Sequence, residues 1–190
     1  MIYLDTPFDE AKALSLHAGD SILLSGTIYT GRDAAHKRLV EMIQRGEKLP
    51  FDVQDQIIYF VGPTPPKPGE IFGSGGPTTA GRMDAYSPTM LKLGLRGMIG
   101  KGYRNQEVID AIKEYKGVYF GAIGGAGAYI GKCVIDSEVI AFADLGTEAI
   151  RKLVVKDLPL TVIIDCYGNN LYEIGRKKYL EKKNEDRGKI

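Results

Sequence analysis

The chain has 190 residues, of which 44% are hydrophobic and 26% charged, and its formal net charge at pH 7 is +1. This composition is that of an ordinary globular protein and excludes a disordered chain or a disulfide scaffold. The length suits one domain with a substantial core. The nearly balanced charge argues against nucleic acid as a partner, because a phosphate-binding surface needs an excess of basic residues.

The N-terminal residues Met1–Asp5 lack the basic region and apolar stretch of a signal peptide, and no apolar run has the length of a membrane span. We therefore expect a cytoplasmic protein without a membrane partner. Cys133 and Cys166 are far apart in the sequence and flanked by apolar residues, so we expect buried thiols rather than a zinc site or a redox pair. Two cysteines are also too few to hold an iron-sulfur cluster without help.

The first third of the chain predicts strands at 2–4, within 19–26 and at 56–61. Apolar residues at every fourth position predict a helix over 35–46. The joint between strand and helix, residues 27–33, then carries Arg32 and Asp33 at the helix N-terminus, where backbone donors favour an anion. Four prolines in 62–69 predict a stiff, extended connection.

Further along, the pattern predicts two helices and four strands, at 87–93, 105–117, 97–100, 118–123, 134–135 and 139–142. Residues 146–155 are expected to form a helix, because apolar side chains recur on one helical face. The strands 160–166 and 171–174 are expected to pair as a hairpin across 167–170.

Strands and helices alternate in the middle of the chain and short strands gather near its end, which predicts an α/β domain with a mixed sheet. We place this single domain over residues 1–175. Residues 176–190 mix both charges freely and are expected to be a charged C-terminal tail, either solvated or a frayed helix.

The segment 73–84 contains four glycines, two adjacent threonines and one arginine. It is too flexible for a strand interior and too polar for a core face, so we interpret it as a binding loop rather than a mobile surface turn. Backbone N–H groups in such a loop can converge on an anion, and Arg82 adds a planar fork that matches a carboxylate or phosphate.

A second glycine-rich segment, 124–131, resembles a dinucleotide-binding fingerprint. That interpretation requires a long amphipathic helix directly afterwards, whereas residues 132–136 favour a strand. We therefore prefer the alternative that these glycines let the backbone pass close to neighbouring elements.

Several polar residues fall in loops that follow predicted strands, namely Arg32, Thr78, Thr79, Arg82 and Lys101. Ligands of open α/β sheets bind at the carboxyl ends of the strands, so these side chains could converge although they are distant in sequence. Three cations suit a small dianion such as a dicarboxylate. Each cation taken alone could equally be a solvated surface charge.

His36 lies one turn after Arg32 and could point toward the same pocket, or it could be an ordinary helix histidine. Asp33 and Asp84 are candidates for supporting roles, including that of a neighbour that takes the proton of a threonine hydroxyl, although each could merely cap a helix or orient an arginine. The sequence shows no Ser-His-Asp arrangement and no metal-ligand spacing.

An ordered set of motifs resembles the C-terminal domain of class I iron-sulfur fumarate hydratases and the β subunit of L-tartrate dehydratase. The motifs are Ser25–His36, Gly62-Pro63-Thr64, Gly76–Asp84 and Gly100-Lys101-Gly102, and the resemblance runs from about residue 15 to 175. It implies a swivelling β/β/α domain like the mobile domain of aconitase. It also implies that this chain is the β subunit of a two-subunit hydro-lyase, with two copies of each subunit.

In that family a separate α chain or domain supplies three cysteines to a [4Fe-4S] cluster, and the shortage of cysteines here agrees with a β subunit. Carried over by motif, Arg32, Arg82 and Lys101 would hold the substrate carboxylates. Thr78 would sit at the carbon that gains or loses a proton. The partner's cluster would act as a Lewis acid on the substrate.

Three functions remain open on this basis. The first is a fumarate hydratase β subunit, which hydrates fumarate reversibly to (S)-malate. The second keeps the architecture but takes tartrate or another hydroxy-dicarboxylate. The third is a non-catalytic dicarboxylate-binding module.

Overall fold

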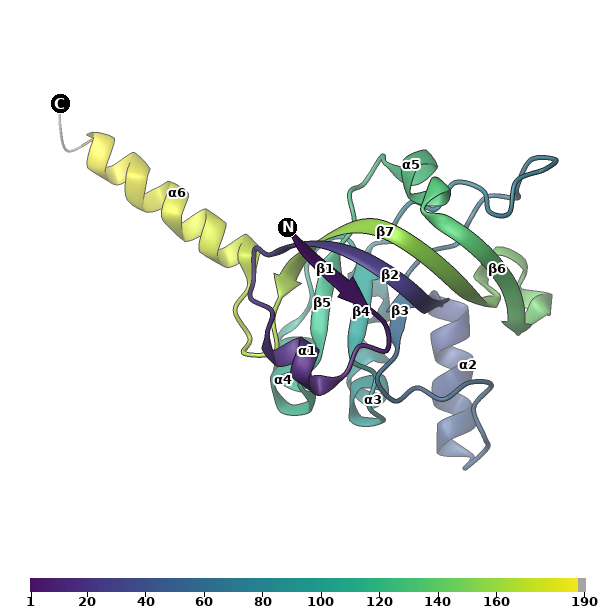
Figure 1. Cartoon of the computed structure of the whole chain (residues 1–190). Helices are drawn as coiled ribbons and strands as arrows, with labels where there is room; N and C mark the ends of the chain where they lie inside the picture. The colour runs from purple at the N-terminus through teal and green to yellow at the C-terminus, as the bar shows by residue number, and fades with distance from the viewer. Residues whose placement is uncertain (188–190) are drawn as a thin grey trace.

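The structure is a computed structural model that describes residues 1–187 (Figure 1). Its strands are β1 (Ile2–Asp5), β2 (Ser21–Thr30), β3 (Ile57–Tyr59), β4 (Gly97–Gly100), β5 (Val118–Gly121), β6 (Val134–Ala141) and β7 (Ile150–Ile164). Its α-helices are α1 (Glu10–Leu14), α2 (Asp33–Gln44), α3 (Ser87–Lys92), α4 (Gln106–Tyr115), α5 (Gly127–Lys132) and α6 (Leu171–Arg187). Two 3-10 helices, η1 (Ala80–Met83) and η2 (Ala143–Glu148), complete the list. The predicted α/β class with a mixed sheet is confirmed.

The seven strands form one mixed sheet in the order β1-β2-β3-β4-β5-β7-β6. Strands β1 to β5 run parallel to one another, and β7 is antiparallel to β2, β5 and β6. Strand β7 also pairs with β2, so the five strands β2, β3, β4, β5 and β7 close into a barrel-like arrangement. Closure satisfies the backbone hydrogen-bonding groups at the edges of these five strands, and β1 and β6 lie outside the barrel-like arrangement.

Both faces of the central strands are buried. Ile57, Tyr59 and Phe120 pack with β2 and β7 in one hydrophobic cluster. Ile58 and Tyr119, one position away in each strand, belong to a second cluster with α2, α3 and α4, which gather on one side of the sheet in Figure 1. Side chains of a strand alternate between its two faces, so burial of both faces explains the continuous apolar runs that predicted these strands.

The predicted helix at 146–155 is wrong. Residues 143–148 form the short η2, and β7 runs without interruption from Ile150 to Ile164. Its first half pairs with β2 on one edge and β6 on the other. Hydrogen bonding on both edges, together with the β-branched residues at 150, 154 and 155, outweighs the helical spacing of the apolar positions.

The predicted hairpin at 160–174 is also wrong. The Asp165 carboxylate accepts hydrogen bonds from Tyr167 N and Asn169 N, both at 3.0 Å, and so closes a turn within the predicted hairpin loop. Asn170 Oδ1 then accepts from Tyr172 N at 3.1 Å, and α6 begins.

Helix α6 extends away from the body of the molecule (Figure 1). It contains most of the predicted charged tail, whose last residues, 188–190, lie outside the described part of the chain. Among residues 1–187, no helix is both long and apolar enough to cross a bilayer.

Candidate active site

The carboxyl ends of β2, β3, β4 and β5 meet at one edge of the sheet, because these strands are parallel neighbours. Arg32 lies two residues beyond β2, Gly62 three beyond β3, Lys101 directly after β4 and Gly124 three beyond β5. This edge therefore collects the loops in which the sequence places most of its candidate binding residues.

Thr78 and Lys101 are joined through their backbones. Lys101 N donates to Thr78 O at 3.2 Å, and Ala80 N donates to Lys101 O at 2.8 Å. Thr78 N donates to Phe60 O at 2.7 Å, which attaches the same segment to the end of β3. Thr78 is half-buried while Lys101 is exposed, so both lie at a surface fixed by hydrogen bonds from behind.

Thr79 pairs with Lys101 in an isolated parallel β-bridge, and Thr79 is exposed. The Lys101 side chain extends toward the second glycine-rich segment: a Cβ at Gly124 would lie 3.7 Å from Lys101 Cδ. The lysine thus lies between the Thr78–Thr79 segment and the loop after β5.

Arg82 projects from η1 and forms an ion pair with Asp33 in the first turn of α2. Its side chain is 54% exposed. Because Asp33 directly follows Arg32, this pair joins the segment that carries Thr78 to the segment that carries Arg32. The two candidate arginines consequently lie in the same region and not on opposite sides of the fold.

Arg32 is the N-cap residue of α2, and its guanidinium lies against Gly62. A Cβ at Gly62 would come within 2.8 Å of Arg32 Nη1, closer than real side chains approach. Arg32 Nη2 is 3.4 Å from Glu148 Oε1, and Glu148 Oε2 accepts from Ala34 N at 3.0 Å. Within residues 1–187, Arg32 Nε is buried and finds no hydrogen-bond partner.

His36 is buried under this edge and not exposed at it. Its Nδ1 is 2.9 Å from Arg32 O, and its ring contacts Phe60 edge-on with a centroid distance of 5.4 Å. Burial lowers the pKa of His36 to about 4. A neutral ring that donates from Nδ1 to the Arg32 carbonyl supports the loop from below, rather than exchanging protons at the surface.

Asp84 is buried too, and its carboxylate is occupied by internal donors. It accepts from Arg104 Nε at 2.6 Å and from Asn105 N at 2.7 Å. The Arg104 guanidinium lies over the Phe60 ring at 5.4 Å and the Tyr119 ring at 5.1 Å from their centroids. These contacts match an aspartate that orients an arginine rather than one that caps a helix.

The two glycine-rich segments pack directly on each other. Gly75 N donates to Gly127 O at 2.9 Å, and the Tyr59 hydroxyl donates to Gly75 O. A Cβ at Gly127 would meet Gly76 N at 2.9 Å, and one at Gly131 would collide with the Gly73 carbonyl. The preference for close backbone approach is confirmed, and α5 is too short for the helix that dinucleotide binding requires.

The family model described as fumarase C-terminus matches residues 1–175. The chain is 43% identical over 152 residues to "Fumarate hydratase class I, aerobic" of Escherichia coli (strain K12), which covers 79% of this chain and 28% of that protein. It is 39% identical over 191 residues to "Putative L(+)-tartrate dehydratase subunit beta" of Methanocaldococcus jannaschii, which covers 97% of this chain and 98% of that protein.

The chain belongs to the fumarase C-terminus family. It spans less than a third of the Escherichia coli fumarate hydratase, and almost the whole of the Methanocaldococcus β subunit. "Fumarate hydratase 2" of Leishmania major is 39% identical over 173 residues, which are 89% of this chain and 30% of that protein. The resemblance stated from the motifs is therefore confirmed.

The cysteines of this fumarase-family chain do not fit an iron-sulfur cluster. Cys133 and Cys166 are both buried free thiols, as expected, and burial raises the pKa of each. Cys166 Sγ contacts Ala13 O at 3.4 Å, whereas Cys133 Sγ lies 3.6 Å from Tyr129 O in another part of the fold. In the described part of the chain, no group of three or more His, Cys, Asp or Glu side chains is arranged to hold a metal ion.

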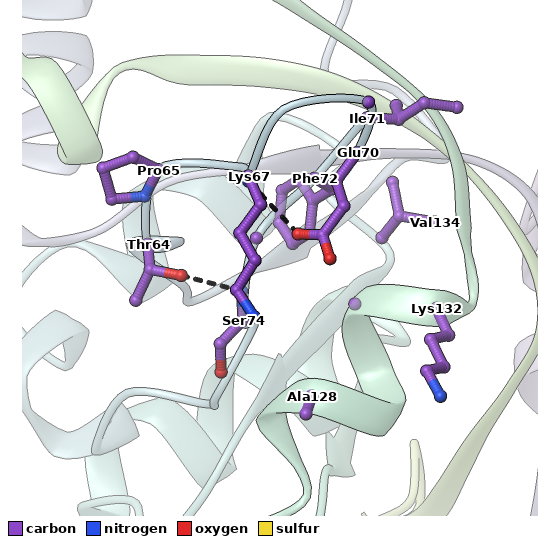
Figure 2. Close-up of a pocket in the computed structure, with 13 residues that line it drawn as sticks. Thr64, Pro65, Lys67, Glu70, Ile71, Phe72, Ser74, Ala128, Lys132 and Val134 are labelled. Atoms are coloured by element: carbon purple, nitrogen blue, oxygen red, sulfur yellow. Dashed lines mark hydrogen bonds between the residues drawn. The ribbon is translucent and has the colours of Figure 1, made fainter.

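A separate hollow of about 530 Å³ lies under the proline-rich connection. The Thr64 hydroxyl accepts from Ser74 N at 2.8 Å and joins the two ends of the loop, as Figure 2 shows. Phe72, Lys132 and Val134 also line the hollow, but the predicted site residues do not. This cavity is therefore distinct from the edge that gathers Arg32, Arg82 and Lys101.

Two residues that contact the candidate site carry no recognisable sequence signal. Glu148 lies in the predicted helix that does not form, and Arg104 belongs to none of the motifs. Glu148 contacts Arg32, and Arg104 contacts Asp84. The two residues of each pair are more than 15 positions apart in the sequence, and folding of the sheet brings them together. The sequence carried no local signal for either contact.

Proposed function

We propose that this chain is the β subunit of a two-subunit, [4Fe-4S]-dependent hydro-lyase of the class I fumarate hydratase type. The proposed reaction is the reversible hydration of fumarate to (S)-malate, and the chain is active only with an α subunit. The proposed assembly contains two copies of each subunit. The proposed location is the cytoplasm.

The observation that carries this proposal is the gathering of three cations and a threonine at one edge of the sheet. Arg82 is paired to the residue next to Arg32, and Lys101 is hydrogen bonded to Thr78. Guanidinium and ammonium groups so placed suit the two carboxylates of a small dicarboxylate. Membership of the fumarase C-terminus family supports the same substrate class.

The cations of this site favour the transition state over the bound substrate. Removal of a proton next to a carboxylate increases the negative charge on that group, and the fixed cations around it stabilise this added charge. In the proposal Arg32, Arg82 and Lys101 bind the carboxylates, and Thr79 borders the site.

Thr78 is proposed to carry the proton to or from the substrate carbon. A threonine hydroxyl is a poor base unless a neighbour or a strong positive field lowers its pKa. Both carboxylate oxygens of Asp84 accept internal hydrogen bonds, from Arg104 Nε and Asn105 N, so Asp84 is not free to take the proton. Asp33 pairs with Arg82 through Oδ2, while its buried Oδ1 has no hydrogen-bond partner among the described residues. We assign the activation of Thr78 to the field of the cations together with groups of the partner chain.

The cluster is proposed to reside on the α subunit, since the two buried thiols of this chain do not suit it. When bound there, it would supply a Lewis acid to the substrate hydroxyl. The contribution of this chain is to hold the carboxylates and to move the proton.

Tartrate is the second candidate substrate, and one finding favours it. The relative that matches this chain over 98% of its own length is named as a putative L(+)-tartrate dehydratase subunit beta. An added hydroxyl is distinguished by few contacts, some of which the partner chain would provide.

The test is to purify the chain anaerobically with a cysteine-bearing companion chain and to measure turnover of malate, fumarate and tartrate. Turnover of malate and fumarate above tartrate supports the fumarate hydratase, and the reverse order supports the second candidate. Absence of turnover of every hydroxy-dicarboxylate, with binding retained, would indicate a non-catalytic binding module instead.

Arg82→Ala tests the site itself in the same complex. We expect kcat/KM to fall roughly 100- to 1,000-fold, as for loss of one charge-stabilising donor. Lys67→Ala, in the separate hollow under the proline-rich connection, is the matched control and should leave kcat/KM unchanged. Equal kinetics for Arg82→Ala and the wild type would remove the site assignment.

A further inference from the structure

Glu148 occupies a position that no sequence motif predicted, beside the guanidinium of Arg32. Its two carboxylate oxygens have different partners: Oε1 faces Arg32 Nη2 at 3.4 Å, and Oε2 accepts from Ala34 N at 3.0 Å. Both side chains are 21% exposed, so the pair is mostly sheltered from solvent. One carboxylate thus contacts both the arginine and the first turn of the helix that carries it.

The relative position of Arg32 and Glu148 is fixed by buried hydrogen bonds. The Thr30 hydroxyl, 1% exposed, donates to Ala149 O at 3.3 Å and accepts from Arg151 N at 2.9 Å. Thr30 is two residues before Arg32, and Ala149 directly follows Glu148. The end of β2 and the start of β7 are therefore held in register at this point.

Gly62 closes the third side of the guanidinium. A Cβ there would lie 2.8 Å from Arg32 Nη1 and 3.4 Å from Thr147 O, so only glycine leaves room for the arginine beside η2. Glu148 engages Nη2 and Gly62 flanks Nη1, whereas Arg32 Nε is buried and has no hydrogen-bond partner among the described residues. Such an unsatisfied donor on a charged group is costly unless a ligand completes it.

We propose that Glu148 is a positioning residue, which holds Arg32 by one edge so that its remaining donors are directed at the substrate carboxylate. This inference rests on the proposed function of Arg32. Glu148 acts through the arginine and does not itself touch the substrate, since a second anion next to the substrate carboxylate would repel it.

The test compares Glu148→Ala, Glu148→Gln and Asp144→Ala in the complex with the cysteine-bearing companion. Asp144 is a matched control on the same 3-10 helix, because its ion-pair partner is Arg38, at 2.8 Å, whereas Arg32 pairs with Glu148. We expect Glu148→Ala to raise KM about ten-fold and to lower kcat less. Glu148→Gln retains one acceptor oxygen, which can serve Arg32 Nη2 or Ala34 N but not both, so it should recover only part of the loss. Asp144→Ala should leave both constants unchanged.

A double-mutant cycle separates positioning from a general structural role. With Arg32 already replaced by alanine, Glu148→Ala should have no further effect on KM or kcat. An additive loss in that background, or an equal loss in Asp144→Ala, would overturn the inference. Normal kinetics in Arg32→Ala would instead contradict the proposed site. Reduced kcat/KM in Arg32→Ala together with normal kinetics in Glu148→Ala would contradict the positioning role alone.

The proposal can also be tested without turnover, so that the test still works if the complex is inactive. Proton–nitrogen NMR spectra of the arginine side chains report the order of the Arg32 Nε–H group directly. Glu148→Ala should shift and broaden this signal, while Asp144→Ala should leave it in place. An unchanged Arg32 signal in Glu148→Ala would contradict the proposal whatever the activity.

Discussion

Two arginine–aspartate pairs near the candidate site differ in burial and therefore in role. The Arg104–Asp84 side chains are 0% and 11% exposed, while those of Arg82–Asp33 are 54% and 27% exposed. The first pair lies beneath the loops, stacked on Phe60 and Tyr119, and the second lies at the surface of the candidate site. The same two residue types thus support the fold in one place and are available to a ligand in the other.

The difference follows from the cost of removing charge from water. A buried guanidinium is tolerated only with its partner, so breaking the buried pair leaves an uncompensated charge. An exposed pair is screened by solvent and contributes little to stability. Four predictions test this contrast between the buried layer and the surface, in order of expected effect on the free energy of unfolding.

The largest effect is expected for Asp84→Ala. Loss of this carboxylate leaves Arg104 buried without its ion-pair partner and removes the acceptor for Asn105 N, so the free energy of unfolding should fall by about 3–5 kcal/mol. Urea denaturation measures it. Asp33→Ala is the control at the surface and should cost about 1 kcal/mol or less, and similar losses for both variants would erase the contrast.

Acid should destabilise the buried layer through His36. The pKa of His36 falls from 6.5 to about 4 on folding, so the unfolded chain binds the proton more readily between these values. The associated stability is complete above pH 6.5 and is lost as the pH falls toward 4, by about 3 kcal/mol in total.

The His36→Phe variant isolates this contribution, since phenylalanine retains the contact with Phe60 and does not titrate. Asp33 and Arg104 also act on His36, and they remain present in both proteins. The difference in unfolding free energy between wild type and variant should decrease from pH 7 to pH 4. A difference that stays constant over this range would show that His36 is not buried in its neutral form.

An intermediate effect is expected for the glycine-rich segment that borders the hollow under the proline-rich connection. A Cβ at Gly73 would collide with the Thr64 carbonyl, whereas one at Gly76 would meet nothing within 4 Å. Gly73→Ala should cost about 1–3 kcal/mol as the backbone shifts, and Gly76→Ala should stay within about 0.5 kcal/mol. Thermal denaturation of the two variants measures both losses of stability. If both losses are small, the backbone of this loop is not tightly packed at Gly73.

The smallest effect on stability is expected for Arg82→Ala, the variant for which we expect a large loss of turnover. Its side chain is more than half exposed, so unfolding should change by about 1 kcal/mol or less. A loss comparable to that of Asp84→Ala would mean that Arg82 supports the fold and that its kinetic effect is indirect.

Much of the parallel part of the sheet and its loops could be predicted from the sequence. The strands at 57–59, 97–100 and 118–121 lie in short apolar runs that each end at or next to a glycine, and α2 and α4 have regular apolar faces. The local spacing of apolar residues in the sequence is enough to predict these elements. The same local patterns placed Arg32, Thr78 and Lys101 in loops after strands, and the order of their motifs indicated the family.

The tertiary structure alone decided the region from η2 to α6 and the partners of the charged residues. Ile150–Val155 has apolar spacing compatible with a helix, and it becomes strand because β2 and β6 offer hydrogen bonds on both of its edges. In the same way, nothing local distinguishes Asp84 from Asp33, or marks Glu148 as the neighbour of Arg32. Burial and ion pairing depend on distant segments, so they are determined only when the sheet closes.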